Sequence, residues 1–159
     1  MIITDHHEDR AFTREQELNE KYGKKVTTSH RMDVTNKNEV EEIFSRYDAV
    51  DILINNAGIS LPNKESGKNY DKENWDETLR INLTAHFTCS QEVIKYMKKQ
   101  KTGSIINITS INAELGFPRN PSYVASKGGL KMLGKALAKD WGKYGIRVNN
   151  LGPGLSKQI

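Results

Sequence analysis

Apolar and polar positions along the chain predict strands that alternate with amphipathic helices. A short apolar start at 1–4 precedes a charged helical stretch at 9–22, which ends before Gly23. Compact apolar runs at 50–55 and 103–110 are typical of strands that are buried on both faces. Further strands are predicted at 26–34 and 145–151, and further helices at 35–47, 74–99 and 122–143. The pattern therefore favours a mixed α/β protein.

The order of these elements indicates the layout of the sheet. Strands that alternate with helices of this length form βαβ units, which place the strands in parallel and helices on both faces of the sheet. No repeat, low-complexity tract or Pro-rich linker marks a domain boundary. We therefore predict a single α/β domain over residues 1–159, with a Rossmann-like three-layer αβα architecture.

Composition is typical of water-soluble globular proteins. The 159 residues, 36% hydrophobic and 28% charged, are enough for one domain with one core. No apolar run approaches the length of a membrane span, and the acidic N-terminus is unlike a secretory signal. The single cysteine, Cys89, excludes an intramolecular disulfide. We therefore expect a cytoplasmic protein with no membrane partner, in which Cys89 is a small core residue.

The formal net charge of +4 raises the question of a nucleic-acid partner. Most lysines, however, interleave with Glu and Asp along helical segments. The densest cluster, at 96–101, lies where a helix should end and where cations favour the helix dipole. We therefore expect no nucleic-acid partner. The histidines show no metal-ligand grouping with Cys89, so we expect no metal site and interpret them as surface or structural residues. They are His6, His7, His30 and His86.

Unusual residues gather at the predicted strand ends. NNAG at 55–58, Ser110 and GPG at 152–154 each lie at or just beyond the end of a strand. The carboxyl ends of parallel strands share one edge of a sheet, where ligands of such folds bind. Tyr123 and Lys127 lie four positions apart near the start of the next helix, so their side chains share one face. The pattern predicts one pocket that contains the serine, the tyrosine, the lysine and the NNAG turn.

At these positions the sequence resembles the short-chain dehydrogenase/reductase family. NNAG, a serine thirteen positions before a tyrosine, Y-x-x-x-K, and R-V-N followed by P-G occur in the family's order and spacing. The asparagine of INL, Asn82, corresponds to a fourth catalytic residue of the family. The resemblance runs from Ile2 to Gly154. It implies an NAD(P)-binding domain and hydride transfer between the cofactor and a hydroxyl or carbonyl group.

The resemblance gives catalytic roles to Asn82, Ser110, Tyr123 and Lys127. In the family the tyrosine donates and accepts the proton. A free tyrosine, with a pKa of about 10, is a poor base at neutral pH unless an ammonium such as that of Lys127 stabilises its phenolate. The lysine also holds the nicotinamide ribose. Ser110 would hydrogen-bond the substrate oxygen, and Asn82 would hold a water that continues the proton relay.

The resemblance also implies a set of cofactor contacts. An acidic residue at the end of the family's second strand binds the ribose 2′-hydroxyl and repels a 2′-phosphate, so Asp5 favours NAD over NADP. Asp33 and Val34 match residues that flank the adenine, and the NNAG turn lies beside the cofactor's ribose and also stabilises the central sheet. The cofactor-binding residues expected on this basis are Asp5, Asp33, Val34, Asn55, Ala57, Gly58, Tyr123, Lys127, Pro153 and Gly154.

The chain departs from the family pattern at both ends. The family begins with a strand and a glycine-rich turn that receives the cofactor's pyrophosphate at a helix N-terminus. This chain opens at what resembles the second strand, and no counterpart of the substrate-covering segment or the last strand follows Gly154. We therefore expect a sheet without its first central strand and its last strand. The strands at 1–4 and 50–55 would then pair directly, or leave buried backbone groups unpaired at about 1–3 kcal/mol each.

For function, these features predict an NAD-dependent oxidoreductase for a small polar substrate of sugar, polyol or oxoacyl type, because polar loops at 60–74 and 113–120 should line the substrate side. Without the glycine-rich turn, the isolated chain is expected to bind NAD weakly and to turn over slowly. Saturable NADH binding at micromolar concentration would contradict this.

The alternative is a non-catalytic α/β remnant that serves only in protein association. In the family, helices corresponding to 74–99 and 122–143 form the subunit interface, so a homodimer or homotetramer is expected. The second helix carries an apolar stripe that suits either an interface or the core. Its residues are Leu130, Leu133, Leu137 and Trp141.

Overall fold

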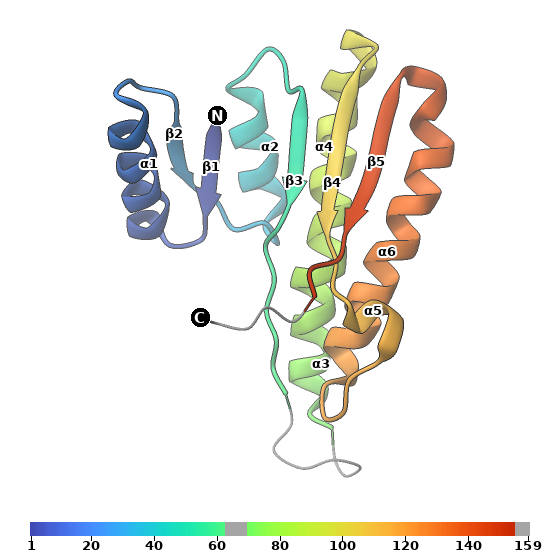
Figure 1. The fold of residues 1–159 in the computed structure, drawn as a ribbon. Coiled ribbons are helices and arrows are strands. Elements are labelled where there is room, and N and C mark those ends of the chain that lie inside the picture. The colour runs from blue at the N-terminus through green and yellow to red at the C-terminus, as the bar shows by residue number, and fades with distance from the viewer. Residues whose placement is uncertain (63–69, 155–159) are drawn as a thin grey trace.

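The computed structural model describes residues 1–62 and 70–154 and has the alternating α/β order that the sequence predicts (Figure 1). The strands are β1 (Ile2–Asp5), β2 (Thr28–Arg31), β3 (Ile52–Asn55), β4 (Gly103–Ile108) and β5 (Ile146–Leu151). The α-helices are α1 (Glu8–Tyr22), α2 (Lys37–Ser45), α3 (Lys72–Leu79), α4 (Ala85–Gln100), α5 (Asn112–Leu115) and α6 (Pro121–Trp141). Of these, only the short α5 has no counterpart among the predicted elements.

Local signals account for several helix ends. The Asn36 side chain accepts a hydrogen bond from the backbone N–H of Asn38, as an N-cap residue does. Asp71 caps α3 in the same way. α1 ends at Gly23, whose left-handed φ of 62° suits a residue without Cβ. Pro121 stands in the first turn of α6, where its missing N–H has no helical partner to lose.

The strands form two separate parallel sheets, one of β1 and β2 and one in the order β3-β4-β5. β1 and β3 face each other across a gap in Figure 1, with α2 behind it, and they do not pair. The sequence left two alternatives, direct pairing of these strands or unpaired edges that are buried. Direct pairing is wrong, and so is burial of the edges, because Ile2 is 39% exposed and Ile52 is 60% exposed. Water can therefore satisfy the backbone groups along both edges.

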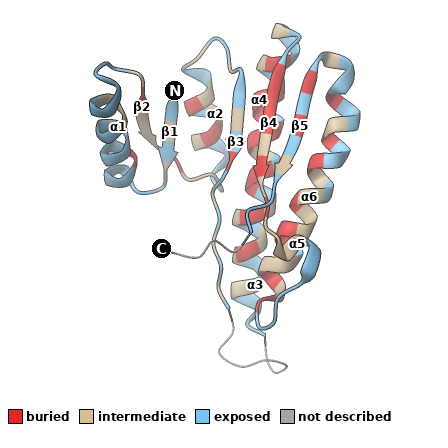
Figure 2. Ribbon diagram, in the orientation of Figure 1, coloured by how far each residue is buried: buried red, intermediate tan, exposed pale blue. Residues whose placement is uncertain are grey.

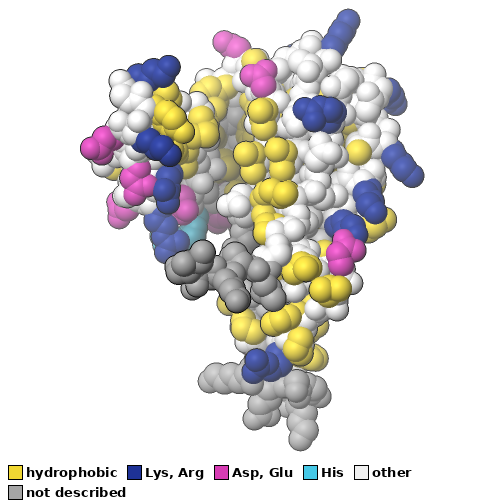
Figure 3. All heavy atoms as spheres, viewed as in Figure 1, with side chains coloured by type: hydrophobic (Ala, Val, Ile, Leu, Met, Phe, Trp, Pro, Cys, Tyr) yellow, Lys and Arg dark blue, Asp and Glu magenta, His cyan; other side chains and the backbone are white. Residues whose placement is uncertain are grey.

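Helices cover only one face of the β3-β4-β5 sheet. α4 and α6 pack against it, and Leu53 and Ile105 point toward them. The alternate residues Ile52 and Ile54 are 60% and 57% exposed on the open face, where Figure 3 shows a stripe of apolar side chains. The prediction that 50–55 is buried on both faces is therefore wrong. The third layer is missing here because no helix among the described residues covers this face (Figure 2).

The main core lies between the β3-β4-β5 sheet and helices α4 and α6. Its buried side chains are Val93, Ile94, Met97, Ile105, Leu137, Trp141, Ile146 and Val148. A second cluster, formed by Met32, Val40, Ile43 and Cys89, joins α2 to α4 and contacts Leu53 of β3. This second cluster holds the two sheets together from the helix side. The expectation that Cys89 is a core residue is confirmed, and burial raises the pKa of its thiol to about 12.

The apolar stripe of α6 faces the core. Leu130, Leu137 and Trp141 are buried, and Leu133 packs against the main cluster. The stripe therefore gives no support to the reading of the chain as an association module. Among the described residues, no helix is both long enough and apolar enough to span a membrane.

A row of asparagines crosses the sheet beneath the helices. Asn55 donates to the Asn107 side chain at 2.9 Å, and Asn107 donates to that of Asn150 at 3.2 Å. The backbone carbonyl of Lys131 in α6 accepts from Asn150 at 2.9 Å. α6 approaches this row at Gly134, where an added Cβ would lie 2.3 Å from the side-chain oxygen Oδ1 of Asn150. The row ties three strands to α6 through polar contacts that need a glycine at that point.

Gly134→Ala is therefore expected to lower the free energy of unfolding by about 1–3 kcal/mol, because the new methyl group displaces hydrogen-bonded side chains from the row. Gly128→Ala in the same helix is the matched control, since no atom lies within 4 Å of its added Cβ. It should be neutral or stabilising by up to about 1 kcal/mol. Urea denaturation of both variants measures the difference, and equal stabilities would contradict the assignment.

Candidate functional site

A pocket of about 360 Å³ lies at the carboxyl edge of the β3-β4-β5 sheet, the edge to which all five strands point in Figure 1. Its lining contains six of the twelve catalytic and cofactor residues that the sequence predicted, namely Gly58, Ser110, Tyr123, Lys127, Pro153 and Gly154. The other lining residues are Asn56, Ile59, Ser60, Ile108 and Thr109. The structure thus brings the NNAG turn, the serine, the Y-x-x-x-K pair and the P-G segment into one pocket. Residues 63–69 of the loop predicted to line the substrate side lie outside the described residues.

The loops after β4 and β5 run side by side along this pocket. The backbone N–H of Thr109 donates to the Leu151 carbonyl at 2.8 Å, and the backbone N–H of Ile111 donates to the Pro153 carbonyl at 3.1 Å. The pairing of the two strands therefore continues past their ends and places Pro153 next to Ser110. The Ser110 hydroxyl oxygen accepts from the backbone N–H of Asn112 at 3.2 Å, at the start of α5.

Lys127 is a buried cation on the same helix face as Tyr123. Its exposed fraction is 4%, and its Nζ donates to the Ile108 carbonyl at 2.8 Å. The Nζ atom lies 5.8 Å from the centre of the Tyr123 ring. Burial lowers the pKa of Lys127 to about 8, because the ammonium has lost most of its water. The pocket therefore holds a positive charge close to the tyrosine over most of the neutral pH range.

Asn82 lies in a π-helical turn, Arg80–Thr84, that separates α3 from α4 and divides the long helix predicted at 74–99. Such turns are frequent at functional sites. The buried amide of Asn82 accepts from the Ile59 N–H at 2.8 Å and donates to the Ile59 carbonyl at 2.9 Å and to Ser126 Oγ at 3.1 Å. Both amide hydrogens are engaged, so Asn82 fastens the segment after the NNAG turn. Its role in a water relay stays a prediction.

His86 follows Asn82 by four positions and contacts the same segment. Its Nε2 atom lies 2.7 Å from the Ala57 carbonyl oxygen, and its exposed fraction is 1%. Burial lowers the pKa of His86 to about 4, against a weaker upward effect of that hydrogen bond, and the charge of Lys127 lowers it further. From the sequence, His86 is interpreted as a surface or structural residue. Its four-residue spacing from Asn82 is the feature that could have placed it on the same helix face as Asn82.

This histidine makes stability depend on pH. Its pKa is about 4 in the folded chain and about 6.5 in the unfolded chain, so the unfolded chain binds more protons between these values and acid favours unfolding. We expect the free energy of unfolding to fall by about 2 kcal/mol from pH 7 to pH 5. Urea denaturation at both pH values measures this loss. The same loss in His86→Phe would show that other groups cause it.

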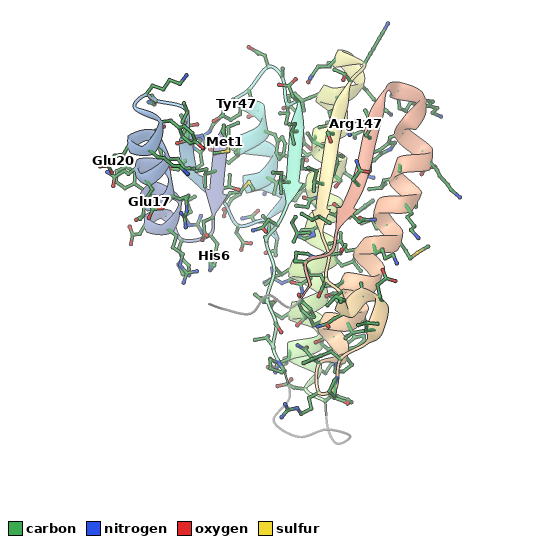
Figure 4. The ribbon with its side chains drawn as sticks, in the orientation of Figure 1. Met1, His6, Glu17, Glu20, Tyr47 and Arg147 are labelled. Carbon is green, nitrogen blue, oxygen red and sulfur yellow. The ribbon has the colours of Figure 1, made fainter. Side chains whose placement is uncertain are left out.

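The residues expected at the adenosine end lie at the ends of β1 and β2. Asp5 Oδ1 accepts from the His7 backbone at 2.8 Å, beside His6, which Figure 4 labels just beyond β1. The Asp33 carboxylate accepts from the Thr35 backbone and hydroxyl at 2.9 and 2.7 Å. Burial acts to raise the pKa of Asp33, but these hydrogen bonds and the charge of Arg80 lower it overall.

Three other predicted cofactor residues, Asn55, Ala57 and Val34, make contacts with other parts of the protein. The Asn55 amide is buried and donates to Ser90 Oγ and to Asn107. The Ala57 carbonyl faces His86. Val34 packs against the second core cluster. Their direct contact with a cofactor stays a prediction, whereas the contribution of Asn55 to the sheet is visible.

The donors and acceptors present suit parts of a dinucleotide. One Nζ hydrogen of Lys127 is used by Ile108, which leaves two for ribose hydroxyls at the pocket. Asp5 Oδ1 accepts from the backbone N–H of His7, and a carboxylate can accept further hydrogen bonds, such as those from ribose hydroxyls. No glycine-rich turn occurs among the described residues. The residues therefore fit the two ribose ends of the cofactor rather than its pyrophosphate.

Comparison with known proteins places this geometry in a family. The family model described as short chain dehydrogenase matches residues 1–157. The chain is 40% identical over 141 residues to 2-dehydro-3-deoxy-D-gluconate 5-dehydrogenase of Formosa agariphila, covering 85% of this chain and 52% of that protein. It is 38% identical over 118 residues to 3-oxoacyl-[acyl-carrier-protein] reductase of Staphylococcus epidermidis, covering 74% and 48%. The chain thus spans about half the length of these curated relatives.

Solved structures share the fold. A gluconate 5-dehydrogenase from Burkholderia cenocepacia, in complex with NADP and tartrate, matches with a TM-score of 0.87 and 32% identity, over 96% of this chain and 60% of that one. NAD⁺-bound xylitol dehydrogenase matches with a TM-score of 0.88 and 29% identity, over 96% and 59%. One of these relatives binds NADP and the other NAD⁺, so the matches leave open which cofactor this chain prefers.

Proposed function

Because the chain belongs to the short-chain dehydrogenase family, we propose that it serves hydride transfer between NAD(H) and a hydroxyl or carbonyl carbon of a small polar substrate. The observation that supports this is the single pocket lined by Ser110, Tyr123 and Lys127. A hydroxyl donor, a phenol and a buried ammonium are the groups that proton transfer at a carbonyl oxygen needs. The predicted fold and family are confirmed, whereas the reaction of this chain is a proposal.

The three side chains divide the proton chemistry between them. Tyr123 gives its phenolic proton to the substrate oxygen in reduction and takes it back in oxidation. The Lys127 ammonium, buried 5.8 Å from the ring centre, stabilises the phenolate that forms when the proton leaves. Ser110 orients the substrate oxygen by a hydrogen bond. Asn82 keeps the pocket wall in place through Ile59. When bound, the nicotinamide would supply or accept the hydride.

For the cofactor we propose NAD rather than NADP. The Asp5 carboxylate lies at the end of β1, where it would accept from a ribose 2′-hydroxyl and repel a 2′-phosphate. Lys127 would hold the nicotinamide ribose. Binding by the 159-residue chain is expected to be weak, because the described residues offer the pyrophosphate no glycine-rich turn.

For the substrate we propose a sugar acid or polyol. The names of the matched relatives include a dehydrogenase of a deoxygluconate, a gluconate 5-dehydrogenase and a xylitol dehydrogenase. The pocket lining includes four residues with hydroxyl groups, which suit a substrate that carries several hydroxyls. They are Ser60, Thr109, Ser110 and Tyr123. An oxoacyl substrate is the second candidate, because a curated relative reduces 3-oxoacyl groups on acyl-carrier protein.

The test is oxidation of gluconate and xylitol with NAD⁺ or NADP⁺, followed by NADH absorbance, at enzyme concentrations high enough to record slow turnover. We expect gluconate or xylitol with NAD⁺ to give the highest rate. Faster reduction of a 3-oxoacyl thioester, measured with NADH or NADPH as the hydride donor, would make the oxoacyl class the substrate instead. No turnover with any of them, in a chain shown by circular dichroism to be folded, would contradict the proposed function for this chain.

We also propose that the protein forms a homo-oligomer through the outer faces of α4 and α6. Phe87 and Met132 are exposed on these two helices, at 40% and 60%. Sedimentation velocity measures the association state.

A further inference from the structure

His86 has a fixed tautomer and one unused nitrogen. The Ala57 carbonyl oxygen only accepts hydrogen bonds, so Nε2, which lies 2.7 Å away, must carry the proton. Nδ1 is then a bare acceptor, and it is buried with no hydrogen-bond partner among the described residues. A phenylalanine would fill similar space without this unpaired nitrogen. The bond to Ala57 is therefore the contribution that distinguishes the imidazole from an apolar ring.

Two residues of one helical face converge on the segment from Ala57 to Ile59. Asn82 holds the N–H and the carbonyl of Ile59, and His86 holds the carbonyl of Ala57. Both side chains come from the π-turn and the first turn of α4. Gly58 lies between the two attachment points, so its backbone is fixed from both sides.

The backbone at Gly58 lies close to the ammonium group of Lys127. A Cβ added to Gly58 would stand 3.4 Å from Lys127 Nζ and 3.3 Å from Asn82 Oδ1. The segment therefore occupies space beside the ammonium that water would otherwise take. Burial is also the cause of the lowered pKa of Lys127. Any loosening of the segment should admit water to this charge.

We propose that His86 is a positioning residue of the candidate active site, whose imidazole holds the Ala57–Ile59 segment against α4 and thereby keeps water from Lys127. It acts through the backbone at Gly58 and is not itself among the residues that line the pocket. The effect of His86 on catalysis depends on the proposed function. Its effect on the Ala57–Ile59 segment and on Lys127 can be measured without turnover.

The first measurement uses the unaltered protein. ¹⁵N NMR of the neutral imidazole should show the Nε2–H tautomer, with Nδ1 unprotonated, throughout pH 6 to pH 9. The opposite neutral tautomer, with the proton on Nδ1 and none on Nε2, would remove the bond to Ala57 and overturn the proposal.

The second measurement compares variants through the pKa of Lys127, read from the NMR shift of its Cε carbon during titration. His86→Phe should raise this pKa from about 8 toward its ordinary value of about 10.5 and should speed amide exchange at Ile59. His86→Gln, which keeps a donor for the Ala57 carbonyl, should restore both readouts toward the original values.

His30→Phe is the matched control. His30 makes a hydrogen bond of the same length, 2.7 Å, to the Tyr47 hydroxyl outside the candidate active site. It should leave the Lys127 pKa and the Ile59 exchange rate unchanged. The proposal is overturned if His86→Phe leaves both readouts unchanged, or if His30→Phe shifts them equally. If His86→Phe does not fold, the tautomer of His86 and the His86→Gln variant test the proposal. A Lys127 pKa that is unchanged in His86→Gln supports the proposal. A Lys127 pKa that rises in His86→Gln counts against it. Because these readouts need no turnover, an inactive chain would contradict the proposed function and leave this inference standing.

Discussion

Tyr123→Phe is expected to lower kcat by about 10²–10⁴-fold, the range that a positioned general acid–base contributes. The variant removes only the phenolic oxygen, and the ring that packs near Lys127 remains. Stability should therefore change by less than about 1 kcal/mol. Substrate binding should change little, because Ser110, which would hydrogen-bond the substrate oxygen in the proposed function, is unaltered. The assay is the NADH absorbance assay with the best substrate, with thermal denaturation run in parallel.

Tyr47→Phe is the control for this experiment. The Tyr47 hydroxyl also makes a hydrogen bond, 2.7 Å from His30 of β2, but Tyr47 is not among the residues that line the pocket. Figure 4 labels it near the amino ends of the strands, whereas the pocket lies at their carboxyl edge. Its removal should leave kcat within about two-fold of the original, since surface and remote substitutions change little. If Tyr123→Phe also kept kcat within that range, another group would have to transfer the proton.

Lys127→Met is expected to change activity and stability in opposite directions. At pH 7 the folded chain holds a buried ammonium, and methionine has a similar length without the charge. We expect the free energy of unfolding to rise by about 1–3 kcal/mol, as is common when a buried charge is replaced by an apolar group. The activity should fall by about 10²-fold or more, because the phenolate loses its electrostatic partner.

The pH dependence of this gain identifies its cause. The pKa of Lys127 is about 8 in the folded chain and about 10.5 in the unfolded chain. The unfolded chain therefore binds more protons between these values, and the stability of the original protein rises with pH across that window. The advantage of the methionine variant should accordingly be greatest below pH 8 and should fade toward pH 10.5. A gain that is constant with pH would mean better packing rather than relief of a buried charge.

Part of this site could be predicted because its signals are local in the sequence. Tyr123 and Lys127 share a helix face for any sequence that keeps them four positions apart on a helix. NNAG, Ser110 and the P-G segment follow strands whose parallel order puts their ends at one edge. Each of these inferences needs only chain order and the geometry of regular elements.

Other features depend on contacts between distant segments. The π-turn at Asn82 and the attachment of its amide to Ile59 join residues 23 positions apart. The partner of His86 lies 29 positions away. No periodic pattern in the sequence predicts either contact, because the partner of a side-chain hydrogen bond depends on which groups the tertiary fold brings close together. The same limit explains the error over Ile52 and Ile54, since an apolar run predicts a strand but not what covers it.

The sequence by itself determined the alternation of elements, the parallel direction of the strands, the family and six of the residues that line the pocket. These follow from hydrophobic period and motif spacing, which are properties of the chain read in order. The tertiary structure alone decided that β1 and β3 stay apart and that one face of the β3-β4-β5 sheet is open. It also decided that Lys127 is buried enough to change its pKa. Burial and edge pairing depend on which segments occupy the space around a residue. The order of residues along the chain does not specify which segments these are.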